Sequence, residues 1–113
     1  MNIVTTERNG ATVFSIRGRL DGIHAAEAEN AFQKLANEGH RRFVFDFAEM
    51  SYISSAGLRV VLVAAKKLRA MQGSLVCAGM SEQVTDVFEM SGFLSILESV
   101  ATVEEAVARL QAD

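Results

Sequence analysis

Proline is absent from this 113-residue sequence, and the one cysteine is Cys77. A lone cysteine cannot form an internal disulfide, which fits a reducing compartment. No hydrophobic segment follows Met1, and the apolar run at residues 60–65 is far shorter than the ~20 residues needed to cross a bilayer. With no repeat, linker or low-complexity tract, we expect one cytoplasmic domain spanning residues 1–113, without a membrane partner.

Several kinds of chemistry also lack their motifs. The net charge of −3 argues against nucleic acid as the main partner, because phosphate binding needs a basic face. Neither Gly-x-Ser-x-Gly nor a glycine-rich nucleotide loop is present, and no Cys/His cluster has metal-ligand spacing. His24 and His40 flank opposite ends of one predicted helix, so they cannot serve one site. We expect no catalytic residue, metal or cofactor.

What the chain does contain is a regular alternation of strand and helix patterns. Asn9-Gly10 separates two β-prone runs and tolerates the positive φ angles of a tight hairpin turn. The predicted elements, in order, are strands 3–7 and 12–16, helix 24–37, strand 43–47, a polar connection at 48–53, a helix from about 54 to 73, strand 74–78, helix 81–91, a short edge strand at 93–97 and a final helix from 102.

This order predicts an α/β fold: a single domain with a mixed four- to five-stranded sheet, an N-terminal antiparallel hairpin and about four helices. The run Phe43–Phe47 reads as a central strand covered on both faces, and its one charge is Asp46. A carboxylate there is costly unless it is hydrogen-bonded. A receiver domain would need further acids and a late lysine that are missing, so we predict that Asp46 accepts backbone N–H groups of the following loop.

Two serines, Ser54 and Ser55, stand where the long central helix begins. Free N–H groups and the positive end of the helix dipole suit a phosphate at this position. The other interpretation of Ser55 is an ordinary helix cap, worth ~1 kcal/mol to the helix. The residue pattern leaves both open. A hydrolase with Ser55 as nucleophile is disfavoured, because no base or orienting acid is in sight.

Four segments, in this order, resemble the anti-sigma factor antagonists, small bacterial proteins of the STAS superfamily. They are Gly18–Asp21 (GRLD), Phe45–Phe47 (FDF), Tyr52–Leu58 (YISSAGL) and Phe88–Phe93 (FEMSGF). The resemblance covers nearly the whole chain and implies a STAS-type domain. Where this family commonly has an acid before its phosphorylated serine, the chain has Ser54.

The resemblance implies a partner switch. The unmodified antagonist binds an anti-sigma factor, usually a serine kinase with a histidine-kinase-type ATPase fold, and thereby frees the sigma factor. The kinase then phosphorylates the serine two places before the glycine, here Ser55, with Ser54 as a second candidate. A PP2C-like serine phosphatase resets the switch. The alternative function is an accessory or scaffold subunit of a transport ATPase or a signalling complex.

The same resemblance places a partner-binding surface around the serines. Its candidate residues are Asp21, Gly22, Tyr52, Ile53, Ser54, Ala56, Gly57, Leu58, Arg59, Met90, Ser91 and Gly92. Asp21 is either a docking contact or a cap for the helix that follows it. Arg59, one helical turn after Ser55, either holds the phosphate or meets the partner. Met90 is either part of an apolar rim or core filler.

Overall fold

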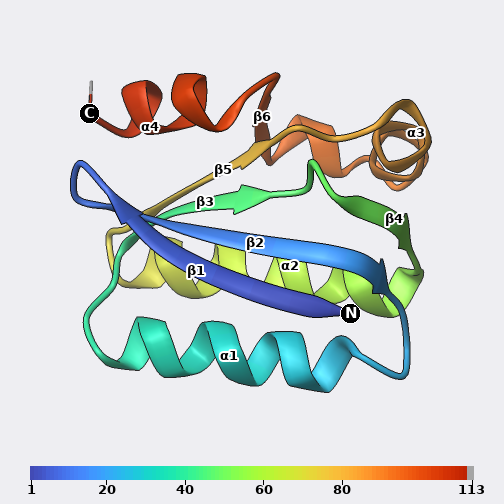
Figure 1. Cartoon of the computed structure of the whole chain (residues 1–113), viewed down its shortest axis with the longest axis horizontal. Coiled ribbons are helices and arrows are strands. Elements are labelled where there is room, and N and C mark those ends of the chain that lie inside the picture. Colours follow the sequence, from blue (N-terminus) through green and yellow to red (C-terminus); the bar gives the residue numbers. More distant parts are fainter. Residues whose placement is uncertain (112–113) are drawn as a thin grey trace.

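The computed structural model describes residues 1–111 and shows a twisted sheet with helices on both faces (Figure 1). The strands are β1 (Asn2–Arg8), β2 (Ala11–Leu20), β3 (Arg42–Asp46), β4 (Met50–Ile53), β5 (Ser74–Ala78) and β6 (Glu98–Val100). The helices are α1 (Ala25–Asn37), α2 (Ser55–Ala70), α3 (Glu82–Met90) and α4 (Val103–Gln111), and one turn of 3₁₀ helix, η1 (Phe93–Ser95), precedes β6.

The sheet is mixed, with strand order β1-β2-β3-β5-β6 and β4 paired with β2 beyond the end of β3. β1 and β2 are antiparallel, and every other pair is parallel. Asn9 and Gly10, with φ angles of 53° and 84°, close the opening hairpin, as their left-handed conformations allow. The predicted α/β class, the N-terminal hairpin and the four helices are confirmed.

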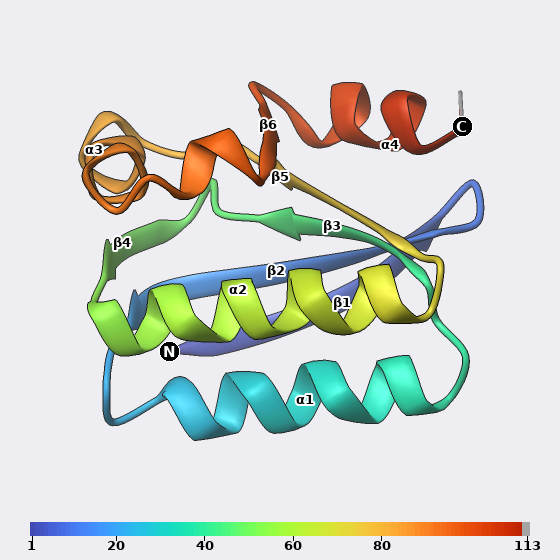
Figure 2. The same ribbon diagram turned by 180° about the vertical axis from the view of Figure 1, so that it is seen from behind.

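Two hydrophobic cores lie on opposite faces of the sheet, because successive strand residues point to opposite sides. α1 and α2 lie side by side on one face (Figure 2), where Phe14, Phe43 and Phe45 pack with Phe32 of α1. The other face is covered by α4, whose buried residues Ala106, Val107 and Leu110 pack with valines of β2, β3 and β5. β3 is therefore covered on both faces, as predicted.

The prediction of a polar connection at residues 48–53 is wrong for its second half, which forms β4. Met50 and Ile53 are buried while Ser51 and Tyr52 are exposed. β2 also runs on to Leu20, past a register shift at Gly18, and this extension pairs with β4. Because Met50 and Ile53 are three positions apart, β4 lacks the alternating apolar pattern by which a strand is predicted from sequence.

The edge strand predicted at 93–97 is also wrong. Gly92 has a φ of 75°, and the chain then makes the single turn of η1, in which the Leu97 amide donates to the Phe93 carbonyl. Leu97 anchors this turn in the core, and the edge strand β6 begins one residue later. Within the described part of the chain the sheet thus has six strands rather than four to five.

Asp46 behaves as predicted. Its Oδ1 accepts the Ala48 amide at 3.0 Å in the following loop, and its Oδ2 accepts the Ser15 hydroxyl at 2.8 Å. Both oxygens of this half-buried carboxylate therefore have donors, which offsets the cost of placing it on a central strand.

Cys77 supplies a test of the core. It is completely buried in β5, and burial raises the pKa of its thiol to about 12. Because the thiolate is the reactive form, we expect native protein at pH 8 to react with a thiol reagent only as fast as it unfolds. The same protein in denaturant should react rapidly with one equivalent. Rapid reaction of the native protein would contradict the packing around β5.

Candidate functional site

The start of α2 is capped by Ser54 rather than by Ser55. Ser54 has an extended backbone, and its Oγ accepts the Gly57 amide at 3.3 Å. Its own amide donates to the Leu20 carbonyl at the end of β2, at 3.0 Å. Ser54 is half-buried, so its hydroxyl is committed to the helix and partly shielded from solvent. The capping role that the sequence left open for Ser55 therefore belongs to its neighbour.

Ser55 is the first residue of α2, and it is exposed. It lies in an open groove of about 580 Å³ between the start of α1 and the start of α2. The groove is lined by Gly22, Ala25, Ala26, Glu29, Asn30, Ser55, Ala56, Arg59 and Val60. Small side chains dominate at the mouth, so a reagent or an enzyme can approach the Ser55 hydroxyl. Arg59, also exposed, brings the groove a positive charge one turn along α2.

Gly57 allows α2 to start directly against β2 and β4. A Cβ atom at this position would lie 2.5 Å from the Leu20 carbonyl oxygen and 2.8 Å from Cγ1 of Ile53. Gly57, Ile53 and Leu58 are all buried in this conformation. Their packing fixes the position of Ser55, and their contact with a partner stays a prediction.

Asp21 organises the turn between β2 and α1, next to the start of α2. Its Oδ1 accepts the Ile23 amide at 3.1 Å, the His24 amide at 3.3 Å and His24 Nδ1 at 2.9 Å. Its Oδ2 lies 3.5 Å from Nε of Arg19, whose guanidinium stacks 4.2 Å from the ring centre of Tyr52. The hydrogen bonds of Oδ1 give Asp21 a cap-like role, and the ion pair of Oδ2 with Arg19 connects it to Tyr52 on the exposed face of β4.

These bonds also shift the ionisation of Asp21. Partial desolvation acts to raise the pKa of its carboxyl, but hydrogen bonds from the His24 ring and amide, the charge of His24 and the Ile23 amide outweigh it. The pKa of Asp21 therefore lies below its ordinary value of 3.8.

The remaining predicted partner residues divide by exposure. Gly22, Tyr52, Arg59, Met90, Ser91 and Gly92 are exposed, and Ala56 is half-buried. Sequence reasoning missed Ile23, whose side chain is 86% exposed beside the Asp21 turn. An isoleucine in a glycine-flanked polar turn was the available signal, since such a residue has no neighbour at strand or helix spacing to cover it.

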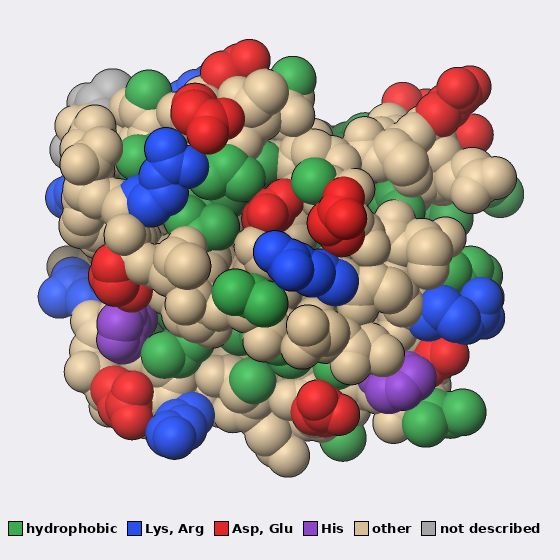
Figure 3. Space-filling view, viewed as in Figure 1, with side chains coloured by type: hydrophobic (Ala, Val, Ile, Leu, Met, Phe, Trp, Pro, Cys, Tyr) green, Lys and Arg blue, Asp and Glu red, His purple; other side chains and the backbone are tan. Residues whose placement is uncertain are grey.

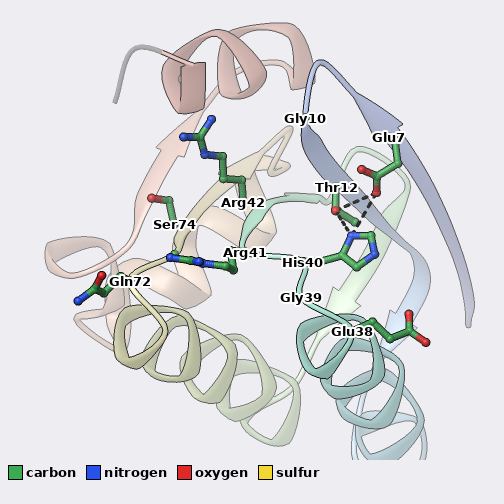
Figure 4. A pocket seen from close by; sticks show the side chains of 11 residues that line it. Glu7, Gly10, Thr12, Glu38, Gly39, His40, Arg41, Arg42, Gln72 and Ser74 are labelled. Atoms are coloured by element: carbon green, nitrogen blue, oxygen red, sulfur yellow. Dashed lines mark hydrogen bonds and ion pairs between the residues drawn. The ribbon is translucent and has the colours of Figure 1, made fainter.

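A second groove, of about 680 Å³, lies among Glu7, Thr12 and the segments that follow α1 and α2 (Figure 4). His40 Nδ1 lies 2.7 Å from the Thr12 hydroxyl, which donates to Glu7 at 2.9 Å. This trio has the residue types of a nucleophile, base and acid. However, Thr12 is only 2% exposed and its proton points to the carboxylate, so the cluster is structural. It includes none of the predicted site residues.

Two further features of residues 1–111 concern metal sites and membrane spans. No group of three or more His, Cys, Asp or Glu side chains in this part of the chain is placed to hold a metal ion. None of its helices is long and apolar enough to cross a membrane.

The close contact at Gly57 predicts a stability change. Gly57→Ala should lower the free energy of unfolding by about 1–3 kcal/mol, because the new methyl group overlaps the Leu20 carbonyl. Urea unfolding measures this. Gly22→Ala is the matched control: a Cβ there meets nothing within 4 Å, so the change should stay within about 0.5 kcal/mol. Equal behaviour of the two variants would show that the contact is not tight.

The lowered pKa of Asp21 predicts a pH dependence. A carboxyl with a lowered folded-state pKa contributes stability above its unfolded pKa, here near 3.8, and loses it as the pH falls through the folded value. Wild type should therefore be more stable than Asp21→Asn at pH 5, and the gap should narrow below pH 3.8. Urea unfolding of both proteins over this range is the measurement. A gap that widens on acidification would refute the assigned hydrogen bonds.

Comparison with known proteins places this geometry in a family. Residues 2–106 match the STAS domain family. The chain is 41% identical over 108 residues to BtrV, a candidate anti-sigma factor antagonist of Bordetella bronchiseptica, covering 96% of this chain and 92% of that protein. It is 31% identical over 83 residues to the anti-sigma-B factor antagonist of Listeria monocytogenes, covering 74% and 73%.

The fold is also that of SpoIIAA, a Bacillus cell fate determinant and anti-sigma factor antagonist. The TM-score is 0.79 to its unphosphorylated form, at 20% identity, covering 99% of this chain and 100% of that chain. It is 0.75 to the phosphorylated form, at 23% identity, covering 96% and 98%. The chain therefore belongs to the STAS domain family, and within it to the anti-sigma factor antagonists.

Proposed function

We propose that this chain is a phosphorylation-controlled partner switch. The unmodified form binds an anti-sigma factor, a serine kinase with a histidine-kinase-type ATPase fold, and releases the sigma factor. Phosphorylation of Ser55 by that kinase ends the complex, and a PP2C-like serine phosphatase restores it. The cycle operates in the cytoplasm, where ATP and the sigma factor are found. The observation that carries the proposal is the exposed Ser55 hydroxyl beside a neighbour that already caps the helix.

The contrast between the two serines supports Ser55 as the proposed acceptor. The kinase moves the γ-phosphoryl group of ATP to Oγ: the Oγ–P bond forms, the bond to the bridging oxygen breaks, ADP leaves and the hydroxyl proton is released. Such an attack needs an accessible oxygen in an open groove, which Ser55 has. Modification of Ser54 would instead require its Oγ to leave the Gly57 amide and the half-buried site.

The proposed phosphate acts on the surface rather than on the fold. It adds a charge of about −1.5 to −2 at pH 7, at the helix end that favours negative charge. Arg59 lies one turn along α2 in the same groove, within the usual reach of an i,i+4 pair. We assign Arg59 to the phosphate rather than to the partner. The modified helix therefore stays folded, while the bulk and charge at the groove disrupt the partner's contact.

Three variants separate the roles of the serines. The measurement is phosphate location by mass spectrometry after incubation with ATPase-type kinases from the source genome, together with binding to the same kinases. Ser55→Ala should bind but accept no phosphate. Ser55→Asp should bind at least tenfold more weakly, a loss of about 1.4 kcal/mol. Ser54→Ala is the control: it should lose about 1 kcal/mol of stability and still be phosphorylated on Ser55.

Two results would overturn the switch. Phosphate on Ser54 alone would reverse the assignment of the acceptor. If no such kinase modifies the chain and Ser55→Asp binds its partner like wild type, the serine is not a switch. That second result would favour the alternative, a scaffold or accessory subunit of a larger assembly.

A further inference from the structure

β1 is a long outer strand of the sheet with one side unpaired. In the strand order β1-β2-β3-β5-β6 of the described chain, the two end strands are β1, paired with β2, and β6, paired with β5. β6 is three residues long, whereas β1 runs for seven, over Asn2–Arg8 (Figure 1). A free edge presents a row of unpaired backbone N–H and C=O groups, so another strand can pair with it.

The hairpin register identifies the backbone groups on this edge. Arg8 lies opposite Ala11 across the two-residue turn, and such a flanking pair is hydrogen-bonded. Hydrogen-bonded and non-hydrogen-bonded pairs alternate along an antiparallel ladder, so Ile3, Thr5 and Glu7 direct their N–H and C=O groups away from β2. Within residues 1–111 these three residues make no backbone hydrogen bond outside the sheet.

β1 lacks the features that usually keep an edge strand from pairing. Proteins protect such edges with proline, lysine, β-bulges or very short strands. The chain has no proline, and residues 2–6 carry no charge. The register with β2 is unbroken from Asn2 to Arg8, so this stretch has no bulge. Ile3 and Val4 are half-buried and the rest of β1 is exposed, which leaves the edge open to a further strand.

A second copy of the same strand fits this edge in one register. If Thr5 of one copy lies opposite Thr5 of the other in an antiparallel pair, Ile3 of each copy lies opposite Glu7 of the other. Every outward-facing backbone group of both copies then has a partner, because each of these pairs exchanges two hydrogen bonds. Sliding the strands by two residues places Glu7 or Ile3 opposite a residue outside β1, so the Thr5-centred register pairs the most groups.

The side chains are compatible with this register. On one face Asn2 lies opposite Arg8 and Val4 opposite Thr6, while Thr5 meets Thr5 on the other face. No like charges are opposed, and Thr–Thr pairs stabilise neighbouring strands. Figure 3 is viewed as Figure 1, with β1 in front, and shows acidic and basic side chains interspersed with apolar ones. Two such surfaces do not repel each other as blocks of one charge would.

We infer that β1 is a self-association site, at which two copies of this chain pair as antiparallel strands about a twofold axis at Thr5. The two sheets join into one continuous sheet, as in recognition by β-strand addition. The inference does not depend on the proposed function. The described residues that line the Ser55 groove include none of β1, so this contact is separate from the phosphorylation site.

Disulfide cross-linking tests the register. Cys77 is buried, so a disulfide between two native copies has to come from an introduced cysteine. Thr5→Cys places two cysteines opposite each other with Cα atoms ~5.5 Å apart, within disulfide range. In the matched control Thr6→Cys, also exposed, the two cysteines are offset along the strands to about 8 Å, beyond that range. Thr5→Cys should cross-link at least tenfold faster, and equal rates would refute the register.

Sedimentation equilibrium tests whether the pair forms in solution. Wild type should shift from one copy towards two as its concentration rises. Thr5→Pro should weaken this association at least tenfold, because proline removes an outward-facing N–H that the hairpin itself does not use. Thr5→Lys and Thr5→Glu should each weaken it as well, whereas a mixture of the two should associate again, since opposite charges then meet at the axis. Circular dichroism checks that each variant is folded.

Three results would overturn the inference. One is a wild type that stays a single copy up to millimolar concentration. The others are a dimer that persists in Thr5→Pro, and a mixture of Thr5→Lys with Thr5→Glu that associates no better than its components, because either result assigns the contact to another surface. If Thr5→Pro does not fold, the mixture decides the question. None of these measurements uses a kinase, so their outcome is independent of the proposed switch.

Discussion

The contact between the start of α2 and the end of β2 is the constraint on which the rest of the site depends. The Leu20 carbonyl accepts the Ser54 amide, and Gly57 packs where any side chain would meet that same carbonyl. One residue later the chain turns at Asp21 and enters α1, so both sides of the groove are fixed by one point of β2. β4 pairs with the same end of β2 and so adds to the support beneath the start of α2.

These contacts at the start of α2 give two adjacent serines different roles. The Ser54 hydroxyl oxygen accepts the Gly57 amide and caps the helix, whereas Ser55 is exposed in the groove. As an anti-sigma factor antagonist, the chain is a regulator and not an enzyme, as its missing motifs predicted. A regulator needs a modification that changes what the surface binds without unfolding the domain. A helix start held by a separate cap meets that requirement, because the proposed phosphate would disturb no bond that the helix uses.

The sequence predicted those features that local patterns encode. Asn9-Gly10 specifies a hairpin by its backbone freedom, and the consecutive apolar residues 43–45 of β3 indicate burial on both faces. The sequence pattern did not predict β4, because its buried residues Met50 and Ile53 are three positions apart. The strand it pairs with, β2, also lies some thirty residues earlier in the chain. The sequence also could not show which serine caps α2, because serine is a preferred capping residue at either position. The extended backbone angles at Ser54 identify it as the cap.

The central claim is that a phosphate on Ser55 changes binding and not folding. The most direct measurement uses the chain with genuine phosphoserine at position 55, and compares its affinity for the anti-sigma factor and its urea unfolding with those of unmodified protein. The account predicts a loss of binding of at least tenfold, about 1.4 kcal/mol, with a free energy of unfolding within about 0.5 kcal/mol of the unmodified value. Undiminished binding, or a loss of binding that accompanies unfolding of the domain, would contradict it.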